Sequence, residues 1–527
     1  MGKRYNWFCT IVAGFGSMLY GIDNVVIAGT FAQPGFLHKF HPSATLLGAI
    51  ATSFYGGTLL GIIGVFALAD RFSRKRTLQF GAALGLIGAL LQSVAQQIAL
   101  FTAARVLTGV ASGVMLTTVQ IYQSEISPPN LRGRMITLQI CTINVAGLAI
   151  AFTGYGTYHS DNPNLQWRLP IALQCVPALA LFIGCFFIPF TPRWLVMHGR
   201  YEEAKSVLRR LHDDNEDHSF WEKEYTVLVA QLDFEKEETA GVTFWHMFTN
   251  KKELKRAGLA VAALTSCQTT GAQTIQVFQS VIYSHLGFDT AKVLLYACIF
   301  QILLNLGGAV NLIAIDWLGR RVLFISGLVM LSIILALFTA CQAQFERTAE
   351  TAWGKAGIAM VMILIFFYAC TYVSTGYAYA AEILPTKIRA QGMALGMFSA
   401  YSMIITFGQV TPIALDKVGY KYLPLFIGFN LLFLPIIAIW CKETKGLSLE
   451  EINVVFGETV VARMSELSED AAHQKTEIRV EQKEYYYGSP GSAKNRCPEK
   501  NVRIATVRRY EDEIEDFRCK SKVRMCV

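Results

Sequence analysis

The sequence predicts an all-α membrane protein with twelve transmembrane helices, arranged as two related six-helix halves. The first observation is composition. Of 527 residues, 53% are hydrophobic and 16% are charged, and the mean hydropathy is +0.37. A typical soluble domain has about 25% charged residues, so a soluble core does not account for this excess of apolar side chains. The composition argues against a secreted disulfide-rich protein, a disordered protein and a nucleic-acid-binding protein.

The second observation is the number of apolar runs. A helix that crosses a bilayer needs about 20 mostly apolar residues. Twelve segments meet this length: 8–29, 47–69, 78–96, 98–120, 135–157, 168–189, 257–285, 291–315, 322–343, 355–381, 392–415 and 421–441. They divide the chain into an N-terminal half (1–189), a charged central loop with short helices (190–256), a C-terminal half (257–441) and a polar tail (442–527). The tail has no apolar period, and we expect it to be largely disordered after about 457.

Lysine and arginine are concentrated in alternate loops. The loop after the second span contains Arg71, Arg74, Lys75 and Arg76, whereas the loop near residue 97 contains none. Basic loops favour the cytoplasmic side of a membrane. We therefore expect both termini and the central loop to be cytoplasmic, and most of the +8 net charge to reflect this bias.

The third observation is a repeat in the charged loops. The pattern D-x-x-[SG]-R-[KR] begins at Asp70 and again at Asp316, after the second span of each half. The pattern E-I-x-P-x-x-x-R begins at Glu125 and again at Glu382, after the fourth span of each half. Two homologous six-helix halves are typical of transporters.

These charges suit a gate, because acids and arginines at helix ends can pair between neighbouring helices. Pairs that cross the two halves would hold the inner side shut and would break when it opens. The alternative is that the charges only anchor and orient helix ends. The candidate gating residues are Asp70, Arg71, Arg74, Glu125, Arg132, Arg134, Asp316, Arg320, Arg321, Glu382 and Arg389.

Several ordered motifs give the chain its resemblance to a known family. They include Tyr20-Gly21-Ile22-Asp23 in the first span, Pro189 to Leu195 after the sixth, and Lys442 to Glu451 after the twelfth. From about residue 8 to 456 the sequence resembles the sugar porter family of the major facilitator superfamily, particularly its fungal members. The resemblance implies the major facilitator fold and transport of a small polyhydroxylated molecule by alternating access. We also expect a monomer in the lipid bilayer of the plasma membrane, with a vacuolar membrane as the alternative.

The seventh span contains an unusual number of amide side chains. Amides suit a polyol because each can donate and accept hydrogen bonds. At 100° per residue on a continuous helix, the polar side chains fall within an arc of about 140°. A one-sided polar stripe in a membrane helix faces a cavity or a partner helix, and hydrogen bonding between helices is the alternative explanation. The stripe consists of Thr265, Gln268, Thr269, Gln273, Gln276 and Gln279.

The family resemblance refines this pocket and indicates a changed substrate. The family's second glutamine is Gln268, but Cys267, Gln273, Val277 and Ala400 stand where the family has other pocket side chains. Loss of such amides suggests a disaccharide, a sugar acid or another polyol, with ordinary glucose transport as the alternative. The candidate substrate-binding residues are Gln268, Thr269, Gln273, Gln276, Tyr377, Asn144 and Gln174.

Asp23 lies inside the first span, where an unpaired charge costs about 3 kcal/mol. Arg105, near the start of the fourth span, lies at a matching depth and is its natural partner. The resemblance implies that this aspartate accepts the proton in proton-coupled members and that the arginine tunes it. A proton symporter is the leading hypothesis. A facilitative uniporter with a structural ion pair is the alternative.

Other function classes have less support. A non-transporting sugar sensor would use the long tail to bind partners. An enzyme is disfavoured, because the sequence has no P-loop and no HExxH motif. The twelve cysteines form no CxxC pair or metal-ligand spacing, so we expect neither a metal nor a cofactor.

Overall fold

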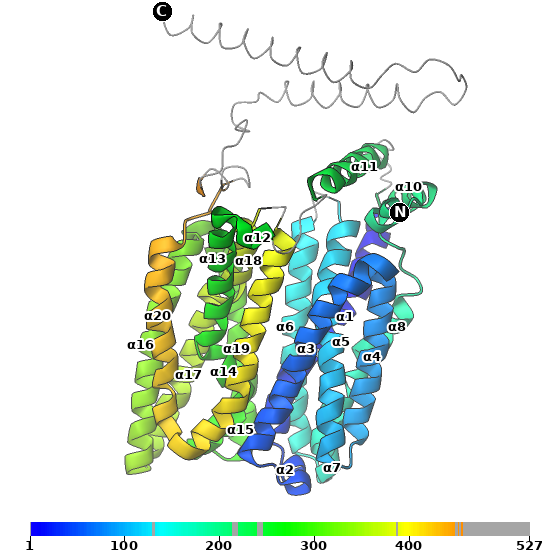
Figure 1. Ribbon diagram of the computed structural model, residues 1–527. Helices are drawn as coiled ribbons and strands as arrows, with labels where there is room; N and C mark the ends of the chain where they lie inside the picture. Colours follow the sequence, from blue (N-terminus) through cyan, green and yellow to red (C-terminus); the bar gives the residue numbers. More distant parts are fainter. Residues whose placement is uncertain are drawn as a thin grey trace, which may run out of the picture. The chain divides into compact units, whose positions relative to one another are not determined.

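The computed structural model describes residues 2–128, 132–212, 220–239, 246–385, 388–447, 452, 455 and 456. Every regular element in these ranges is a helix, and residues 1–459 form one compact unit. Figure 1 shows the helices of the two halves of the chain standing side by side. The predicted all-α fold is confirmed. The part of the tail after 457 lies outside the described residues.

The N-terminal half follows the six predicted spans in order. Its sixth span is divided in two, because Pro177 has no N–H to donate to the carbonyl of Leu173, which accepts instead from Val176 N at 3.1 Å. A short helix follows the first span. The elements are α1 (Gly2–Thr30), α2 (Pro34–Phe40), α3 (Ala44–Phe72), α4 (Arg74–Val94), α5 (Ile98–Ile126), α6 (Arg132–Tyr158), α7 (Pro163–Ala172) and α8 (Cys175–Gly184).

The central segment forms α9 (Pro192–Met197), α10 (Tyr201–His212), α11 (Phe220–Thr239) and α12 (His246–Thr249). The C-terminal half follows, and two of its spans are also divided. Its elements are α13 (Lys251–Thr269), α14 (Ala272–His285), α15 (Thr290–Leu318), α16 (Arg320–Thr348), α17 (Thr351–Thr371), α18 (Val373–Ile383), α19 (Arg389–Val418), η1 (Gly419–Tyr422) and α20 (Pro424–Trp440).

Ten helical stretches of the described chain are long and apolar enough to cross a membrane. The remaining two predicted spans are the interrupted pair α13 and α14, and α20 with 17 residues. Several helices extend beyond the predicted runs; α5, for example, continues to Ile126 rather than ending at 120. Hydropathy detects only the lipid-embedded part of a helix, whereas the helix itself continues into the polar region.

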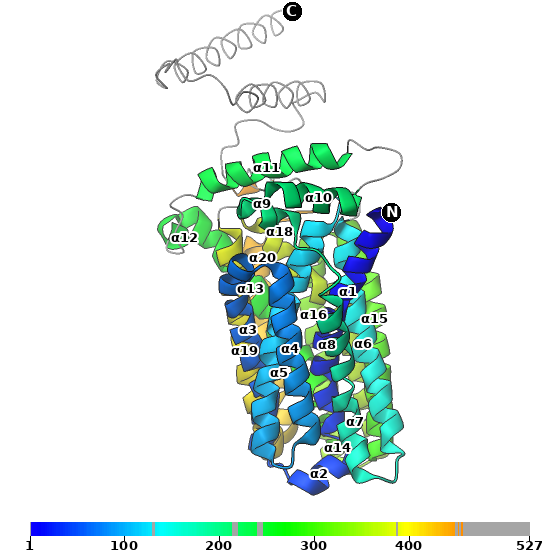
Figure 2. The ribbon, with the colours of Figure 1, turned by 90° about the vertical axis from the view of Figure 1, so that its right-hand side faces the viewer.

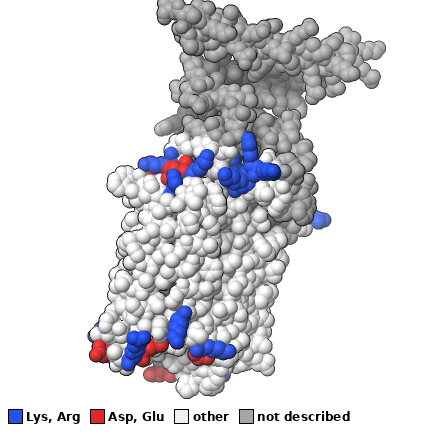
Figure 3. All heavy atoms as spheres, turned by 60° about the vertical axis from the view of Figure 1, so that its left-hand side comes forward, with Lys and Arg blue, Asp and Glu red and all other residues white. Residues whose placement is uncertain are grey.

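The two ends of the helical unit differ. Figure 2 shows α9, α10 and α11 near the N-terminus, and α2 at the opposite end. We call these the loop end and the α2 end. Figure 3 shows charged side chains gathered at both ends, with a broad uncharged band between them. Large apolar side chains on the outside, such as Ile313 (75% exposed) and Ile439 (71% exposed), suit contact with lipid.

Contacts between the halves are found at the α2 end. Thr52 of α3 donates to Gln409 Oε1 of α19 at 3.3 Å, and Gln409 Nε2 donates to the carbonyl of Thr45 at 3.2 Å. The ring of Phe31 stacks on that of Phe278, with centroids 6.3 Å apart. These contacts close the two halves against each other at this end.

Candidate functional site

Asp23 of α1 and Arg105 of α5 form an ion pair inside the N-terminal half. Arg105 Nη1 lies 3.5 Å from Asp23 Oδ1, and the side chains are 1% and 0% exposed respectively. Ser112 Oγ donates to Asp23 Oδ2 at 2.9 Å. The Arg105 guanidinium also lies over the Phe54 ring, 4.5 Å from its centroid. Removing two charges from water is costly, and mutual attraction with added hydrogen bonds offsets that cost.

Next to this pair, α3 presents a tyrosine to both halves. The Tyr55 hydroxyl donates to Asn24 Oδ1 at 3.0 Å. The same hydroxyl lies beside Gln273 of α14, which comes from the other half. Asn24 directly follows Asp23, so the ion pair and this interface are one residue apart along α1.

Three more tyrosines and one amide extend the same interface. The Tyr377 hydroxyl lies beside Gln268, and Tyr20 of α1 lies beside Tyr401 of α19. Tyr377 is 36% exposed, and its neighbours come from both halves. Amides and tyrosines can bind polar hydroxyls and apolar ring faces of one ligand. We name the central cluster Tyr20, Asn24, Tyr55, Gln268, Gln273, Tyr377 and Tyr401.

The polar stripe of the seventh span does not lie on one continuous helix. Gly271 has φ of +84° and separates α13 from α14. The arc calculated for an unbroken helix is therefore wrong. On α13, Thr265 pairs with Ser399 of α19 at 2.7 Å, while Thr269 Oγ1 donates to the carbonyl of Ser266 in its own helix at 3.3 Å.

Other predicted pocket residues lie elsewhere. Asn305 Nδ2 of α15 contacts the Asn144 carbonyl at 3.5 Å, which places Asn144 where α6 meets α15. Gln174 is buried at the break between α7 and α8, and its amide atoms have no hydrogen-bond partner among the described residues. Gln276 of α14 is 6% exposed. The described contacts do not connect these three residues to the central cluster.

The repeated charges of the N-terminal half form a compact pair at the loop end. Arg74 Nη2 lies 3.0 Å from Glu125 Oε1, and the two side chains are 7% and 9% exposed. Arg74 Nη1 also donates to the carbonyl of Ala69 at 3.2 Å. Arg193, after the sixth span, lies 4.0 Å from the same carboxylate. The pair holds the adjoining ends of α3, α4 and α5 together.

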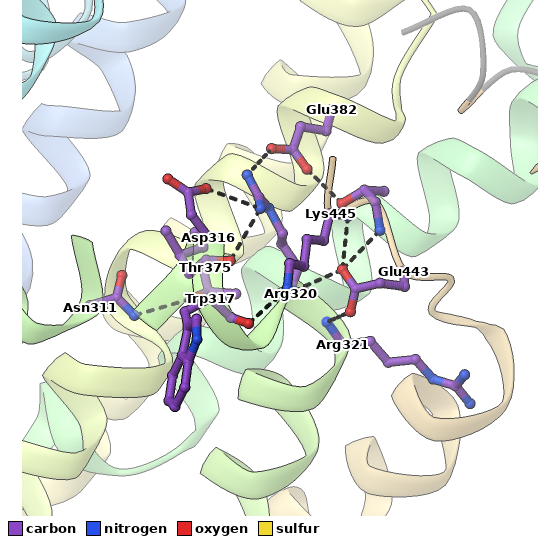
Figure 4. Close-up of polar contacts among 11 residues, drawn as sticks. Asn311, Asp316, Trp317, Arg320, Arg321, Thr375, Glu382, Glu443 and Lys445 are labelled. Atoms are coloured by element: carbon purple, nitrogen blue, oxygen red, sulfur yellow. Dashed lines mark hydrogen bonds and ion pairs between the residues drawn. The ribbon is translucent and has the colours of Figure 1, made fainter. Parts of the chain in front are cut away.

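The C-terminal half repeats this arrangement. Arg320 Nη2 lies 2.9 Å from Glu382 Oε1, and its Nη1 donates to the carbonyl of Ile315 at 3.2 Å (Figure 4). As for Arg74, that carbonyl lies five residues earlier in the chain. Arg320 also pairs with Asp316 at 3.3 Å. The sequence repeat is therefore also a repeat of contacts.

The segment after the last helix adds links that the sequence analysis did not assign. Glu443 Oε1 accepts from the N–H of Arg320 at 2.9 Å, and Oε2 accepts from that of Arg321 at 3.0 Å. Thr444 Oγ1 donates to Glu382 Oε2 at 2.6 Å, and Lys445 Nζ donates to the Trp317 carbonyl at 2.8 Å (Figure 4). An acidic residue that caps a distant helix has no local sequence signal.

The remaining gating candidates make contacts of other kinds. Arg321 Nη2 donates to the Ala438 carbonyl at 2.7 Å, Arg389 Nε donates to the Leu384 carbonyl at 3.1 Å, and the Arg71 guanidinium lies over the Phe72 ring. Three of the ion pairs described at the loop end lie within one half, namely Arg74–Glu125, Arg320–Asp316 and Arg320–Glu382, whereas Arg193–Glu125 joins the central segment to the N-terminal half. The side chains of three candidates lie outside the described residues: Asp70, Arg132 and Arg134.

The family model described as "Sugar (and other) transporter" matches residues 9–456. The chain belongs to this family. The MFS-type transporter criB of Aspergillus cristatus is 28% identical over 480 residues, which cover 90% of this chain and 99% of the relative. The MFS glucose transporter mfs1 of Aspergillus flavus is 29% identical over 483 residues, which cover 86% of this chain and 90% of the relative.

Solved structures agree on the fold. The inward-open conformation of the xylose transporter XylE from E. coli matches with a TM-score of 0.71 at 19% identity, covering 86% of this chain and 100% of XylE. This likeness establishes the major facilitator fold of the transporter. The family assignment confirms a multi-pass membrane transporter rather than an enzyme.

Sequence reasoning missed part of this transporter's central cluster. Tyr55 and Tyr401 carry no pattern that separates a position between the two halves from an ordinary core position. The position of Asn24, next to an aspartate inside an apolar span, was the one available signal.

Proposed function

We propose that the protein carries a sugar or a sugar-like polyol across the membrane by alternating access, as a proton symporter. The observation that carries this proposal is the Asp23–Arg105 pair, which is fully buried and lies one residue from the Asn24–Tyr55 contact. A buried carboxylate beside a candidate ligand site is suited to couple proton binding to substrate binding. Relatives named as glucose and sugar transporters support the substrate class.

The coupling follows from the surroundings of the carboxylate. Arg105 stabilises charged Asp23, and loss of their contact in a dry environment favours the protonated form. A movement of α1 relative to α5 therefore links proton uptake to conformation. The linkage is reciprocal: if a proton strengthens substrate binding, substrate strengthens proton binding to the same degree.

The two halves move as rigid bodies in this proposal. The Arg74–Glu125 and Arg320–Glu382 pairs each join helices of one half, so these two pairs keep each half intact while the interface between halves opens and closes. The loop end faces the cytoplasm by the distribution of basic residues, both termini are cytoplasmic, and the protein acts as a monomer in the plasma membrane.

The composition of the central cluster favours a substrate other than a simple hexose. It combines four tyrosines with three amides, while Cys267, Val277 and Ala400 are buried nearby in the same helices. Uptake by a transporter-null cell of hexoses, pentoses, disaccharides, polyols and sugar acids, at two pH values, identifies the substrate. Preferential uptake of a simple hexose would contradict the shifted substrate class.

An imposed pH gradient tests the symport. Purified protein in vesicles without other energy sources should accumulate substrate when the lumen is alkaline, and added substrate should dissipate the gradient. A facilitative uniporter gives equilibration without accumulation. Transport that neither responds to the gradient nor dissipates it contradicts the proposed coupling.

The substitution Asp23→Asn tests the role of Asp23 in proton coupling. The substitution keeps size and removes the titratable proton, so accumulation should fall to simple equilibration while exchange of labelled for unlabelled substrate continues. Asp289→Asn is the matched control, since Asp289 is 59% exposed and pairs with Lys292 away from the central cluster. Unchanged accumulation in Asp23→Asn would rule out the coupling role.

A further inference from the structure

A basic cavity lies at the loop end of the C-terminal half, apart from the central cluster. Its volume is about 340 Å³, and four of its lining residues are Lys251, Lys252, Lys255 and Lys442. Apolar side chains complete the lining: Ile439, Trp440 and Phe456. The first three lysines begin α13, and the others lie at or just after the end of α20. Figure 3 shows basic side chains gathered at this end of the molecule.

Among the described residues, the lining of the cavity has four lysines and no acidic side chain. At 100° per residue, Lys251, Lys252 and Lys255 share an arc of about 100° on α13. Glu253 is the acidic residue of this turn, but it is 8% exposed and accepts from Asn250 Nδ2 at 3.2 Å. On the same helix it lies about 160° from Lys251 and Lys255, and it is not among the residues that line the cavity. The N-terminal N–H groups of α13 add further positive potential.

The apolar side of the cavity is continuous with the lipid-facing surface. Ile439 is 71% exposed and Trp440 is 49% exposed at the end of α20. Tryptophan at the end of a membrane helix lies at headgroup level. The Phe456 ring forms a further wall and packs against the buried Arg256 guanidinium, 4.8 Å from the ring centroid. The ligand that fits must therefore combine negative charge with an apolar part.

We propose that this cavity binds an anionic phospholipid, with the headgroup phosphates among the lysines and the acyl chains along α20. Basic pockets between membrane helices on the cytoplasmic side bind such headgroups. The site joins the first and last helices of the C-terminal half. Because α13 continues to Gln268, a bound lipid fixes the loop end of a helix that contributes to the central cluster.

Binding is measured on the full-length protein in detergent, with short-chain phosphatidylinositol 4-phosphate as the probe and phosphatidylcholine as the neutral comparison. Lys251→Gln/Lys255→Gln should weaken binding of the anionic probe about tenfold or more, since each lysine near such a site contributes about 1 kcal/mol. Lys251→Arg/Lys255→Arg should retain it. The matched control is Lys417→Gln/Lys421→Gln, which removes two exposed lysines at the α2 end.

Each other outcome overturns the proposal. Equal loss in the matched control shows attraction to overall charge rather than a site. Unchanged binding in Lys251→Gln/Lys255→Gln places the lipid elsewhere. A soluble inositol phosphate that binds as tightly as the lipid shows a site for free phosphates. The readout is binding and not transport, so it is independent of the proposed proton symport.

Discussion

The two loop-end charge clusters share one backbone design but differ in burial. In each, an arginine at the start of a helix donates to a carbonyl five residues earlier and pairs with a glutamate from the fourth span of its half. In the N-terminal half, the side chains of Arg74 and Glu125 are 7% and 9% exposed. In the C-terminal half, those of Arg320 and Glu382 are 13% and 26% exposed. The C-terminal cluster also receives Glu443 and Thr444 from the segment after α20.

The difference shows that the same repeated backbone arrangement can be stabilised by two different sets of side-chain contacts. Among the described residues, the N-terminal cluster centres on the nearly buried Arg74–Glu125 pair, with Arg193 4.0 Å from the same carboxylate. In the C-terminal half, the Arg320–Glu382 pair is more exposed, and Glu443 and Thr444 add further hydrogen bonds to the cluster. Loss of a single group should therefore be more damaging in the N-terminal half.

Glu125→Gln should have the largest effect. It removes the buried carboxylate charge that faces Arg74, and disrupting a buried pair costs about 3 kcal/mol or more. Glu382→Gln should cost about 1 kcal/mol, because its site is more exposed and keeps other hydrogen bonds. Thermal unfolding of the two variants in the same detergent measures the difference. Equal destabilisation would mean that the difference in burial has no energetic consequence.

Glu443→Ala should lower stability by an intermediate amount, and the loss should be confined to the C-terminal half. It removes the acceptor for two N–H groups at the start of α16, for a loss of about 1–2 kcal/mol, as for other helix caps. Faster amide hydrogen exchange at Arg320 and Arg321 is the measurement. Thr444→Val is the control, because it removes only the link to Glu382 and should leave those two amides protected.

The smallest effects are expected at the residues that precede the two helices. Ser73 and Gly319 have φ of +83° and +89°. Gly319→Ala should cost about 1 kcal/mol, since alanine is strained at this φ. Its Cβ would also lie 2.6 Å from Glu443 Oε2. Ser73→Gly should change stability by a few tenths of a kcal/mol, because relief of strain offsets loss of the cap to Arg76 N. Similar unfolding temperatures for the two variants would contradict this asymmetry.

The spans, the repeat and the closeness of Asp23 to Arg105 could all be derived from the sequence. Each depends on a property that a short segment carries by itself, namely hydropathy, spacing or the cost of a charge inside an apolar helix. The structure brought Asp23 and Arg105 together at the depth that their positions in the spans imply.

The shape of the central cluster could not be derived in the same way. The break at Gly271 rearranges the amides that a continuous helix would align, and a glycine within an apolar span is compatible with either geometry. Tyr55 and Tyr401 look like ordinary core residues because their partners come from distant helices. Glu443 belongs to a recognisable motif, but its partner helix begins more than a hundred residues earlier.

The break at Gly271 also has a mechanical consequence. A continuous α-helix resists bending, because a change of direction stretches its ladder of backbone hydrogen bonds. Between α13 and α14 the ladder is already interrupted, and α14 starts its own with Ile275 N bonded to the Gly271 carbonyl at 2.9 Å. Changes in a few backbone torsion angles at Gly271 can therefore reorient α14 while α13 stays in place. The seventh span can then move as two rigid helical segments joined by a hinge.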